Sequence, residues 1–205
     1  MASSPYCDDV PSEMETYGDF TFNKGLGNIT IFSYSGKDAN VVIPSKINGR
    51  PVKRLEHYFI LNNNTMESLT LSEGIERISY SFIGHCDKLK VISLPSTVEF
   101  NSANSGMFAG APGLVDTCEA LETINLASGN PYLSVIDHVL YNKDMTILIC
   151  YPPKNRSTVI HVPDGVQTIE ANTFEHNHYV EEIVLPDSVQ SIGYWAFNDC
   201  AALKK

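Results

Sequence analysis

The chain has 205 residues, of which 43% are hydrophobic and 19% are charged, and its formal net charge is −10. This length and composition suit one sizeable folded domain or a short array of small units, and they exclude a disordered chain. The negative charge argues against nucleic-acid binding, because nucleic acids favour clustered lysine and arginine. No apolar stretch is long enough for a membrane helix, so we expect no membrane insertion.

Residues 1–17 show no hydrophobic periodicity, and we expect a disordered tail there, or residues added for expression. Residues 18–40 alternate apolar and polar side chains around a glycine-rich turn, with Phe22 before the turn and Ile29 after it. This alternation predicts a β-hairpin. The hairpin would cap the exposed end of the structure that follows.

Residues 41–205 repeat a short pattern. An apolar residue is followed by others three and five positions later: Met66/Leu69/Leu71, Leu89/Ile92/Leu94, Leu121/Ile124/Leu126 and Val180/Ile183/Leu185. The last of these positions recurs at Ile43 and Val162, and the base period is 23 residues, with insertions. A unit this short cannot bury a core alone, so neighbouring copies must stack and share one.

The repeat predicts an α/β solenoid dominated by sheet. Each I-x-L segment should be a strand of a parallel sheet, and short helical or turn segments, such as residues 78–82 and 192–197, should return the chain. Residues 132–154 alternate again and predict a β-hairpin insertion. The last copy begins at Cys200 and Leu203 without its I-x-L segment, so we expect a truncated array, belonging to a longer protein.

One column of the repeat contains only asparagine or cysteine. It lies three residues before the first apolar position of each copy: Asn63, Cys86, Cys118, Asn177 and Cys200. We expect these side chains to point inward and to satisfy buried backbone groups. The five cysteines are an odd number without C-x-x-C pairs, so the sequence indicates neither a disulfide framework nor a zinc site.

Two long segments carry a family resemblance. Residues 74–95, GIERISYSFIGHCDKLKVISLP, and residues 165–203 resemble the BspA-like leucine-rich repeats of bacterial surface and secreted proteins, and residues 18–55 and 132–154 are similar to their N-terminal and hairpin segments. The resemblance implies a bacterial source and a place outside the cell or on its surface. It also implies adhesion to a host or matrix protein. One departure from the better-known leucine-rich repeat is that the asparagine or cysteine column precedes the strand.

Residue pairs that could support catalysis have simpler interpretations. His85 and Cys86 are adjacent, but Cys86 belongs to the inward column, so we expect a structural thiol. Neighbouring carboxylates, Asp8-Asp9 and Glu181-Glu182, should be solvated, because a hydrolase needs carboxylates that converge across a cleft. No phosphate-binding loop or hydrolase motif is present in the sequence. We therefore expect no enzyme and no cofactor.

His176 and His178 have a spacing that metals can use. A zinc site needs three or four protein ligands, and the sequence around this pair shows no third one. We therefore expect loop histidines that face solvent, and no metal site.

Aromatic residues recur two and three positions after the return-segment apolar residue, and four of them are our candidate binding residues: Tyr58, Tyr80, Tyr194 and Trp195. Exposed tyrosine and tryptophan suit a protein hot spot or a sugar-stacking platform. The alternative is that they cover the edge of the core.

The sequence as a whole favours a non-catalytic protein-binding module of a bacterial surface or secreted protein, whose ligand is a host or matrix protein. The alternative is a targeting or scaffold module, with polysaccharide as its ligand, in a larger secreted enzyme or multi-enzyme complex.

Overall fold

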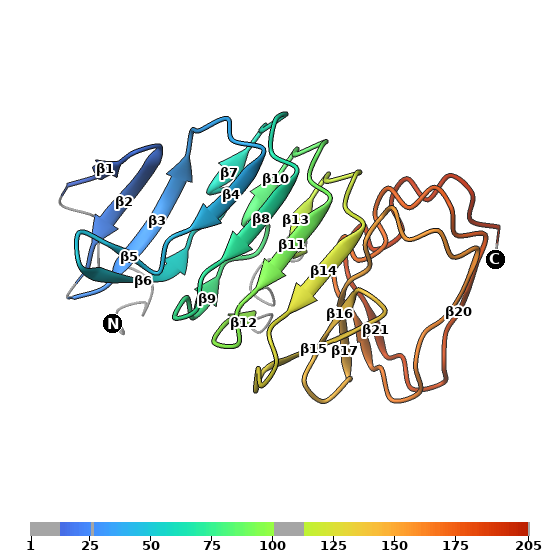
Figure 1. Ribbon diagram of the computed structural model, residues 1–205. Helices are drawn as coiled ribbons and strands as arrows, with labels where there is room; N and C mark the ends of the chain where they lie inside the picture. Colours follow the sequence, from blue (N-terminus) through green and yellow to red (C-terminus); the bar gives the residue numbers. More distant parts are fainter. Residues whose placement is uncertain (1–12, 26, 101–112, 205) are drawn as a thin grey trace, which may run out of the picture.

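The computed structural model describes residues 13–25, 27–100 and 113–204. Residues 1–12 of the predicted tail, which include Cys7, Asp8 and Asp9, lie outside these ranges. The described residues form a row of coils that follows the chain from its N-terminal part to its C-terminal part (Figure 1). They contain strands and turns but no helix, and so none that is long and apolar enough to span a bilayer.

The I-x-L segments form parallel strands, as the repeat predicts. Four of them build one sheet, in the spatial order β14 (Thr123–Leu126), β11 (Val91–Leu94), β8 (Ser68–Leu71) and β4 (Asn40–Ile43). Equivalent repeat positions pair, since Ile92 is in register with both Leu69 and Ile124. A separate two-stranded parallel sheet follows, with β18 (Val159–His161) and β20 (Glu182–Val184).

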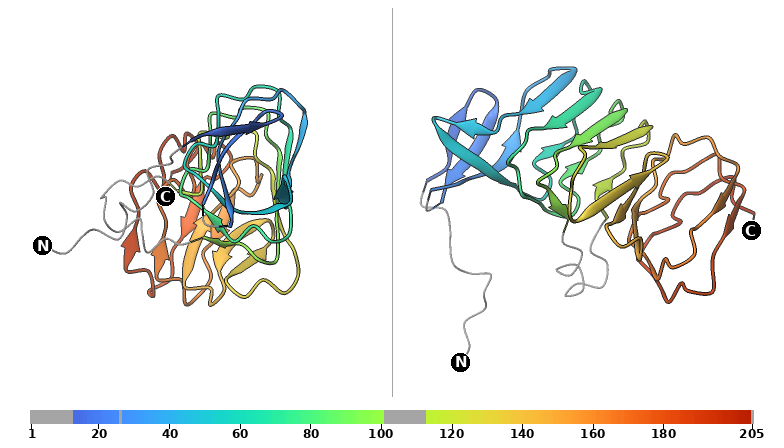
Figure 2. Two further views of the ribbon diagram at one scale, coloured as in Figure 1. Left: turned by 90° about the vertical axis from the view of Figure 1, so that its left-hand side faces the viewer. Right: turned by 60° about the horizontal axis from the view of Figure 1, so that its bottom comes forward.

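Each coil returns through further short strands. One sheet includes the parallel strands β6 (Arg50–Leu55), β9 (Arg77–Ile78) and β12 (Glu99–Phe100). A second sheet includes β19 (Thr168–Ile169) and β21 (Ser191–Ile192) from the later coils. A third is formed by β7 (Ile60–Leu61), β10 (Ile83–Gly84) and β13 (Val115–Asp116). Seen along the array, the coils of the N-terminal part overlie one another around a shared interior (Figure 2, left).

The sequence predicted short helical or turn segments and an α/β class; among the described residues the turns are present and the helical part of the prediction is wrong. Each of four return segments holds two non-glycine residues in the left-handed backbone region, four positions apart: Tyr58 and Asn62, Ser81 and His85, Asn172 and His176, and Trp195 and Asp199. A right-handed helix needs consecutive residues with negative φ, so a left-handed residue at this spacing interrupts it. The chain turns through sharp corners instead, separated by two-residue strands or by turns.

The N-terminal segment continues the sheet of the return strands. Strands β1 (Glu15–Tyr17), β2 (Phe20–Lys24) and β3 (Ile29–Tyr34) are joined antiparallel, and β3 then pairs in parallel with β6. Residues 15–17 were expected in the tail, but they pair with β2 along the outer edge of the sheet. The short strand β5 (Lys46–Ile47) pairs with β6 through Asn48 and Gly49. Both turn residues have positive φ, as a type I′ hairpin turn requires.

A three-stranded insertion interrupts the coils. Strands β15 (Leu133–Ile136), β16 (Val139–Asn142) and β17 (Ile147–Cys150) are antiparallel, and β17 pairs in parallel with β19. The right-hand view of Figure 2 shows this insertion, in yellow and orange, between the green and red parts of the array. The sequence predicted one hairpin here; the structure adds a second turn at Asp137 and His138, both with positive φ.

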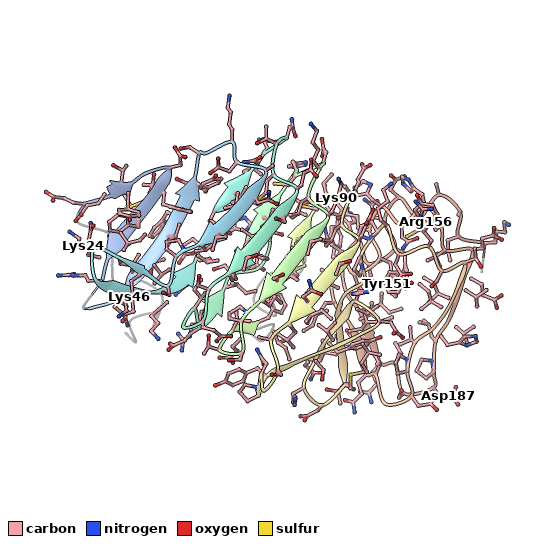
Figure 3. The ribbon with its side chains drawn as sticks, in the orientation of Figure 1. Lys24, Lys46, Lys90, Tyr151, Arg156 and Asp187 are labelled. Atoms are coloured by element: carbon pink, nitrogen blue, oxygen red, sulfur yellow. The ribbon has the colours of Figure 1, made fainter. Side chains whose placement is uncertain are left out.

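The insertion lies between two hydrophobic cores. Coils N-terminal to it bury one cluster, which includes Phe59 and Phe82, and coils C-terminal to it bury another, which includes Phe174 and Val180. Aromatic rings stack within each cluster, with 5.8 Å between the centroids of Phe59 and Phe82. In Figure 3 Tyr151 lies in the C-terminal part of the molecule, where its ring packs 5.1 Å from that of Phe174.

Side chains one period apart pair on the surface of the array. The Nζ atom of Lys90, labelled in Figure 3, lies 2.9 Å from Oε2 of Glu67, and the same spacing of 23 residues separates Lys204 from Glu181. Exposed ion pairs of this kind contribute about 0–1 kcal/mol each. They show that equivalent positions of successive coils lie side by side on the surface, so a column of the sequence becomes a column in space.

Candidate functional site

The asparagine and cysteine column lies at the corner that leads from each return segment into the next strand. The Oδ1 atom of Asn63 accepts hydrogen bonds from the backbone N–H groups of Thr65 and Met66, at 3.1 and 2.9 Å. The same atom of Asn177 accepts from Tyr179 and Val180, at 3.0 Å each. These bonds satisfy N–H groups at a corner where the backbone has no strand partner.

The cysteines of the column use their thiols in a related way. The Sγ atoms of Cys86 and Cys118 donate to the carbonyl oxygens of Gly84 and Asp116, each over 3.4 Å. Cys200, which is half-buried, donates to the carbonyl of Phe174 on the preceding coil over 3.0 Å. All these thiols are free, and Cys86 and Cys118 are buried.

The buried thiols give a prediction about reactivity. A hydrogen bond with Cys86, together with burial, raises the pKa of Cys118 well above its ordinary value, and burial raises the pKa of Cys150 to about 12. Because the thiolate is the reactive form, we expect iodoacetamide at pH 8 to modify both more than about 100-fold more slowly in the folded protein than in guanidinium chloride. Mass spectrometry of each labelled peptide measures this, and equal rates in the two solvents would contradict the burial.

Adjacent residues His85 and Cys86 face opposite ways. The side chain of His85 is half exposed, with Nε2 3.9 Å from Oδ2 of Asp116, whereas Cys86 is fully buried. Two open hollows lie elsewhere on the described surface, one lined by residues 34–37 and 61–65 and the other by residues 161–164 and 184–186. Neither lining contains a cysteine or the carboxylate pairs considered from the sequence. Among the residues that the structure describes, these groups are not brought together as a catalytic arrangement.

Two of the four candidate aromatic residues, Tyr58 and Tyr80, pack against other side chains of the return segments. The ring of Tyr58 lies so close to Gly84 that a Cβ atom there would come within 2.7 Å of it, and its hydroxyl donates to Oδ2 of Asp116 over 2.5 Å. Burial and this hydrogen bond raise the pKa of Tyr58 above its usual value. The ring of His57 contacts both Tyr58 and Tyr80, with centroid distances of 3.9 and 4.8 Å.

The other two candidate residues are exposed. Tyr194 and Trp195 expose 57% and 54% of their surface, and their ring centroids are 4.9 Å apart. Trp195 has a φ of 56°, in the left-handed backbone region. Nearby positions of the same coil are also apolar and exposed: Ile192 exposes 49% of its surface, whereas Ile169, one period earlier, exposes none.

The structure adds a partner to the histidine pair that the sequence treated as isolated. The Oδ2 atom of Asp199 lies 2.9 Å from Nδ1 of His176 and 3.2 Å from Nε2 of His178. These contacts, the one with His176 first, hold the pKa of Asp199 below its usual value. Asp199 stands 23 residues after His176 in the same column, so reading down the repeat would have found it.

Asn130 is a buried polar residue that the sequence analysis missed. Its Nδ2 atom donates to the carbonyl oxygens of Pro95 and Val98, and its Oδ1 atom accepts from the backbone N–H groups of Tyr132 and Leu133. It thus joins the corner that starts the insertion to the corner of the preceding coil. The Gly-Asn-Pro run at residues 129–131 indicates a turn, but nothing in it reveals the two carbonyl groups of the other coil.

These coils, with parallel strands, inward leucine-type positions and a polar residue at each corner, define a leucine-rich repeat protein. The sequence matches the family described as BspA type leucine rich repeat region, in six copies over residues 13–133 and 150–205. The chain belongs to this family. The matched ranges leave out residues 134–149, which hold most of the three-stranded insertion.

Solved structures of bacterial repeat proteins share the fold. The chain is similar to the pneumococcal vaccine antigen PcpA, with a TM-score of 0.60 and 14% identity over 95% of this chain and 70% of that one. It is also similar to a leucine-rich repeat protein of T. pallidum, with a TM-score of 0.54 and 20% identity over 94% and 92%. A leucine-rich repeat protein of Eubacterium ventriosum gives 0.50 and 17% over 92% and 69%. No curated protein sequence matched the chain.

Proposed function

We propose that this chain is a non-catalytic protein-binding module of a bacterial surface or secreted protein, built as a solenoid that recognises a host or matrix protein. Membership of the BspA type family supports this, because leucine-rich repeat families typically act as binding modules. The likeness to bacterial proteins, one of them described as a vaccine antigen, supports a place outside the cell or on its surface. We retain the predicted division into a tail, a cap over residues 18–40 and an array over residues 41–205, with the tail ending before β1.

The exposed pair Tyr194 and Trp195 is the observation that carries the proposal. Aromatic side chains with this exposure offer large apolar area at a low cost in conformational entropy, and they are enriched among residues that dominate protein interfaces. Tyr58 and Tyr80 are less suited to contact a ligand, because each packs against His57. The binding surface is therefore centred on the last return segment of the described array.

Replacing Tyr194 and Trp195 together by alanine is expected to abolish or weaken ligand binding. Each residue at the centre of an interface can contribute about 2 kcal/mol or more, so we expect at least a tenfold loss of affinity. The measurement is a solid-phase screen of the full chain against host matrix proteins and against plant and mucin polysaccharides. Surface plasmon resonance then gives Kd for each ligand that binds.

The control is Tyr132→Ala, because Tyr132 is an aromatic residue of similar exposure outside the return segments. Protein binding that is lost in the double variant and kept in the control supports the proposal. Binding to polysaccharide alone would favour the alternative, a targeting or scaffold module of a larger secreted enzyme, since stacked aromatic rings also suit sugars. Protein binding that the double variant retains would remove the aromatic pair from the site.

A further inference from the structure

Three side chains on two successive return segments bring potential metal ligands to one place. His176 and His178 flank the buried Asn177, whose inward side chain places its two neighbours on the outer side of the corner. Asp199 occupies the position of His176 on the next coil. One atom from each side chain, two imidazole nitrogens and one carboxylate oxygen, lies within 4.8 Å of the others.

The two separations measured from Asp199 are close to those of a tetrahedral site, and all three ligand atoms lie within 4.8 Å of one another. Zinc bonds to nitrogen and oxygen ligands are about 2.0–2.2 Å long, which places neighbouring ligand atoms about 3.3 Å apart. The two measured separations from Oδ2 of Asp199 are 2.9 and 3.2 Å. A cation between these three atoms would need side-chain rotations, for which His178 and Asp199 are exposed whereas the His176 side chain is only 16% exposed. The His176 and His178 rings are also inclined at 77° to each other, so their nitrogens approach from different directions.

A fourth ligand is within reach from an earlier return segment. The Oε1 atom of Glu119 lies 3.8 Å from Nδ1 of His176, and half of its side chain is exposed. Glu119 directly follows Cys118, as His178 directly follows Asn177, so both residues come immediately after the asparagine and cysteine column. Two carboxylates and two neutral imidazoles would carry a charge of −2, which a divalent cation neutralises.

A buried carboxylate lies near the second ring nitrogen of His176. The Oε1 atom of Glu175 lies 3.9 Å from Nε2 of His176, and its two oxygens accept hydrogen bonds from Asn172 and Asn198. A carboxylate that faces the second ring nitrogen is a common feature of metal-binding histidines, because it orients the ring and raises its basicity. Here the carboxylate is itself fixed by side chains of two coils.

We propose that His176, His178 and Asp199 bind a divalent transition-metal ion of the Zn²⁺ class, with Glu119 as the fourth ligand. Two imidazole ligands favour Zn²⁺, Cu²⁺ or Ni²⁺ over Mg²⁺ and Ca²⁺, which prefer oxygen ligands. The ion joins side chains from three return segments, those of Glu119, of the histidine pair and of Asp199. It lies on the return-segment side of the array, where the aromatic pair is also found.

The test is isothermal titration of ZnCl₂ into the untagged full chain in a buffer that does not chelate metals. We expect one equivalent to bind, with no competition from Mg²⁺ or Ca²⁺. His178→Gln and Asp199→Asn should each weaken binding by about 100-fold or more, because losing even an outer partner of a metal site costs about 10–100-fold. The matched control is His161→Gln, an exposed histidine on a strand outside the cluster.

The absorption spectrum of bound Co²⁺ distinguishes binding at this site from binding to the cysteine thiols. Co²⁺ bound by His176, His178 and Asp199 should show tetrahedral d–d absorption without the charge-transfer band of a thiolate ligand. Zn²⁺ at about 100 times its Kd should also raise the Tm by about 5 °C in the parent chain and in His161→Gln, but not in Asp199→Asn. The metal-free Tm of each variant shows that it folds.

Three results would overturn the proposal: no saturable binding by the parent chain, equal affinity in the parent chain and Asp199→Asn, or a thiolate band in the Co²⁺ spectrum. Glu119→Gln tests the fourth ligand separately. We expect it to weaken binding at least about tenfold, and an unchanged Kd would remove Glu119 from the site.

Discussion

Replacing Phe174 by alanine is expected to lower the free energy of unfolding by about 3–5 kcal/mol, because the ring is fully buried and its loss leaves a cavity. Phe174 is stacked between Tyr151 on one coil and Phe197 on the next, at centroid distances of 5.1 and 5.3 Å. Its removal therefore weakens the contact between three successive layers of the C-terminal core. Urea unfolding followed by circular dichroism measures the change.

The chain supplies a control of the same chemistry, because Phe197 occupies the same column 23 residues later and is only partly buried. Phe197→Ala should cost about half as much or less, since less apolar surface is withdrawn from water at this position. Equal losses in the two variants would show that burial along the column is uniform, contrary to the structure.

Asn130→Ala is expected to cost about 3–5 kcal/mol, although it removes only a small polar side chain. Its four hydrogen bonds are 2.8–3.2 Å long and all involve backbone groups. Each buried donor or acceptor left without a partner costs about 1–3 kcal/mol, and relaxation of the corner recovers part of the sum. The free energy of unfolding, again from urea titration, tests this value.

Two variants distinguish the hydrogen bonds of Asn130 from general disruption of the corner. Asn130→Asp keeps the acceptor for the two N–H groups but sets a carboxylate oxygen against the carbonyls of Pro95 and Val98, so it should also destabilise. Asn63→Ala removes a half-exposed asparagine of the inward column and should cost about 1 kcal/mol, because water can replace its bonds. A small loss in Asn130→Ala would mean that the corner relaxes without this residue.

The repeat pattern predicted the parallel strands because their register depends on spacing alone. The positions Leu69, Ile92 and Ile124 pair as the alignment of copies requires. The corners could not be predicted in this way. Residues in the left-handed region include Tyr58, Ser81 and Trp195, and none of these residue types favours positive φ in sequence. The conformation is imposed by the stacking of coils, so the repeat pattern alone left helical or turn segments open at these places.

One feature of the candidate sites, the exposure of the aromatic residues, could not be predicted from the sequence, whereas another, the contact of Asp199 with His176, could. The aromatic column was visible in the sequence, but the exposure of its members was not, because it depends on the side chains that pack against each ring. Tyr58 and Tyr194 differ in this respect although both are aromatic residues of a return segment. The contact of Asp199 with His176 was available from the period, since residues 23 apart in the same column must be neighbours once coils stack.

In the insertion between the two cores, neighbouring residues of one strand pack into different hydrophobic cores. Along β16 the side chain of Leu140 packs into the N-terminal core, whereas Val139 and Tyr141 pack into the C-terminal core. The same alternation places Ile149 and Leu148 of β17 in different cores. The insertion thus separates the two hydrophobic cores, and each of its faces packs into a different one. A substitution at Leu140 should therefore destabilise the N-terminal core, and a separate substitution at Tyr141 should destabilise the C-terminal core.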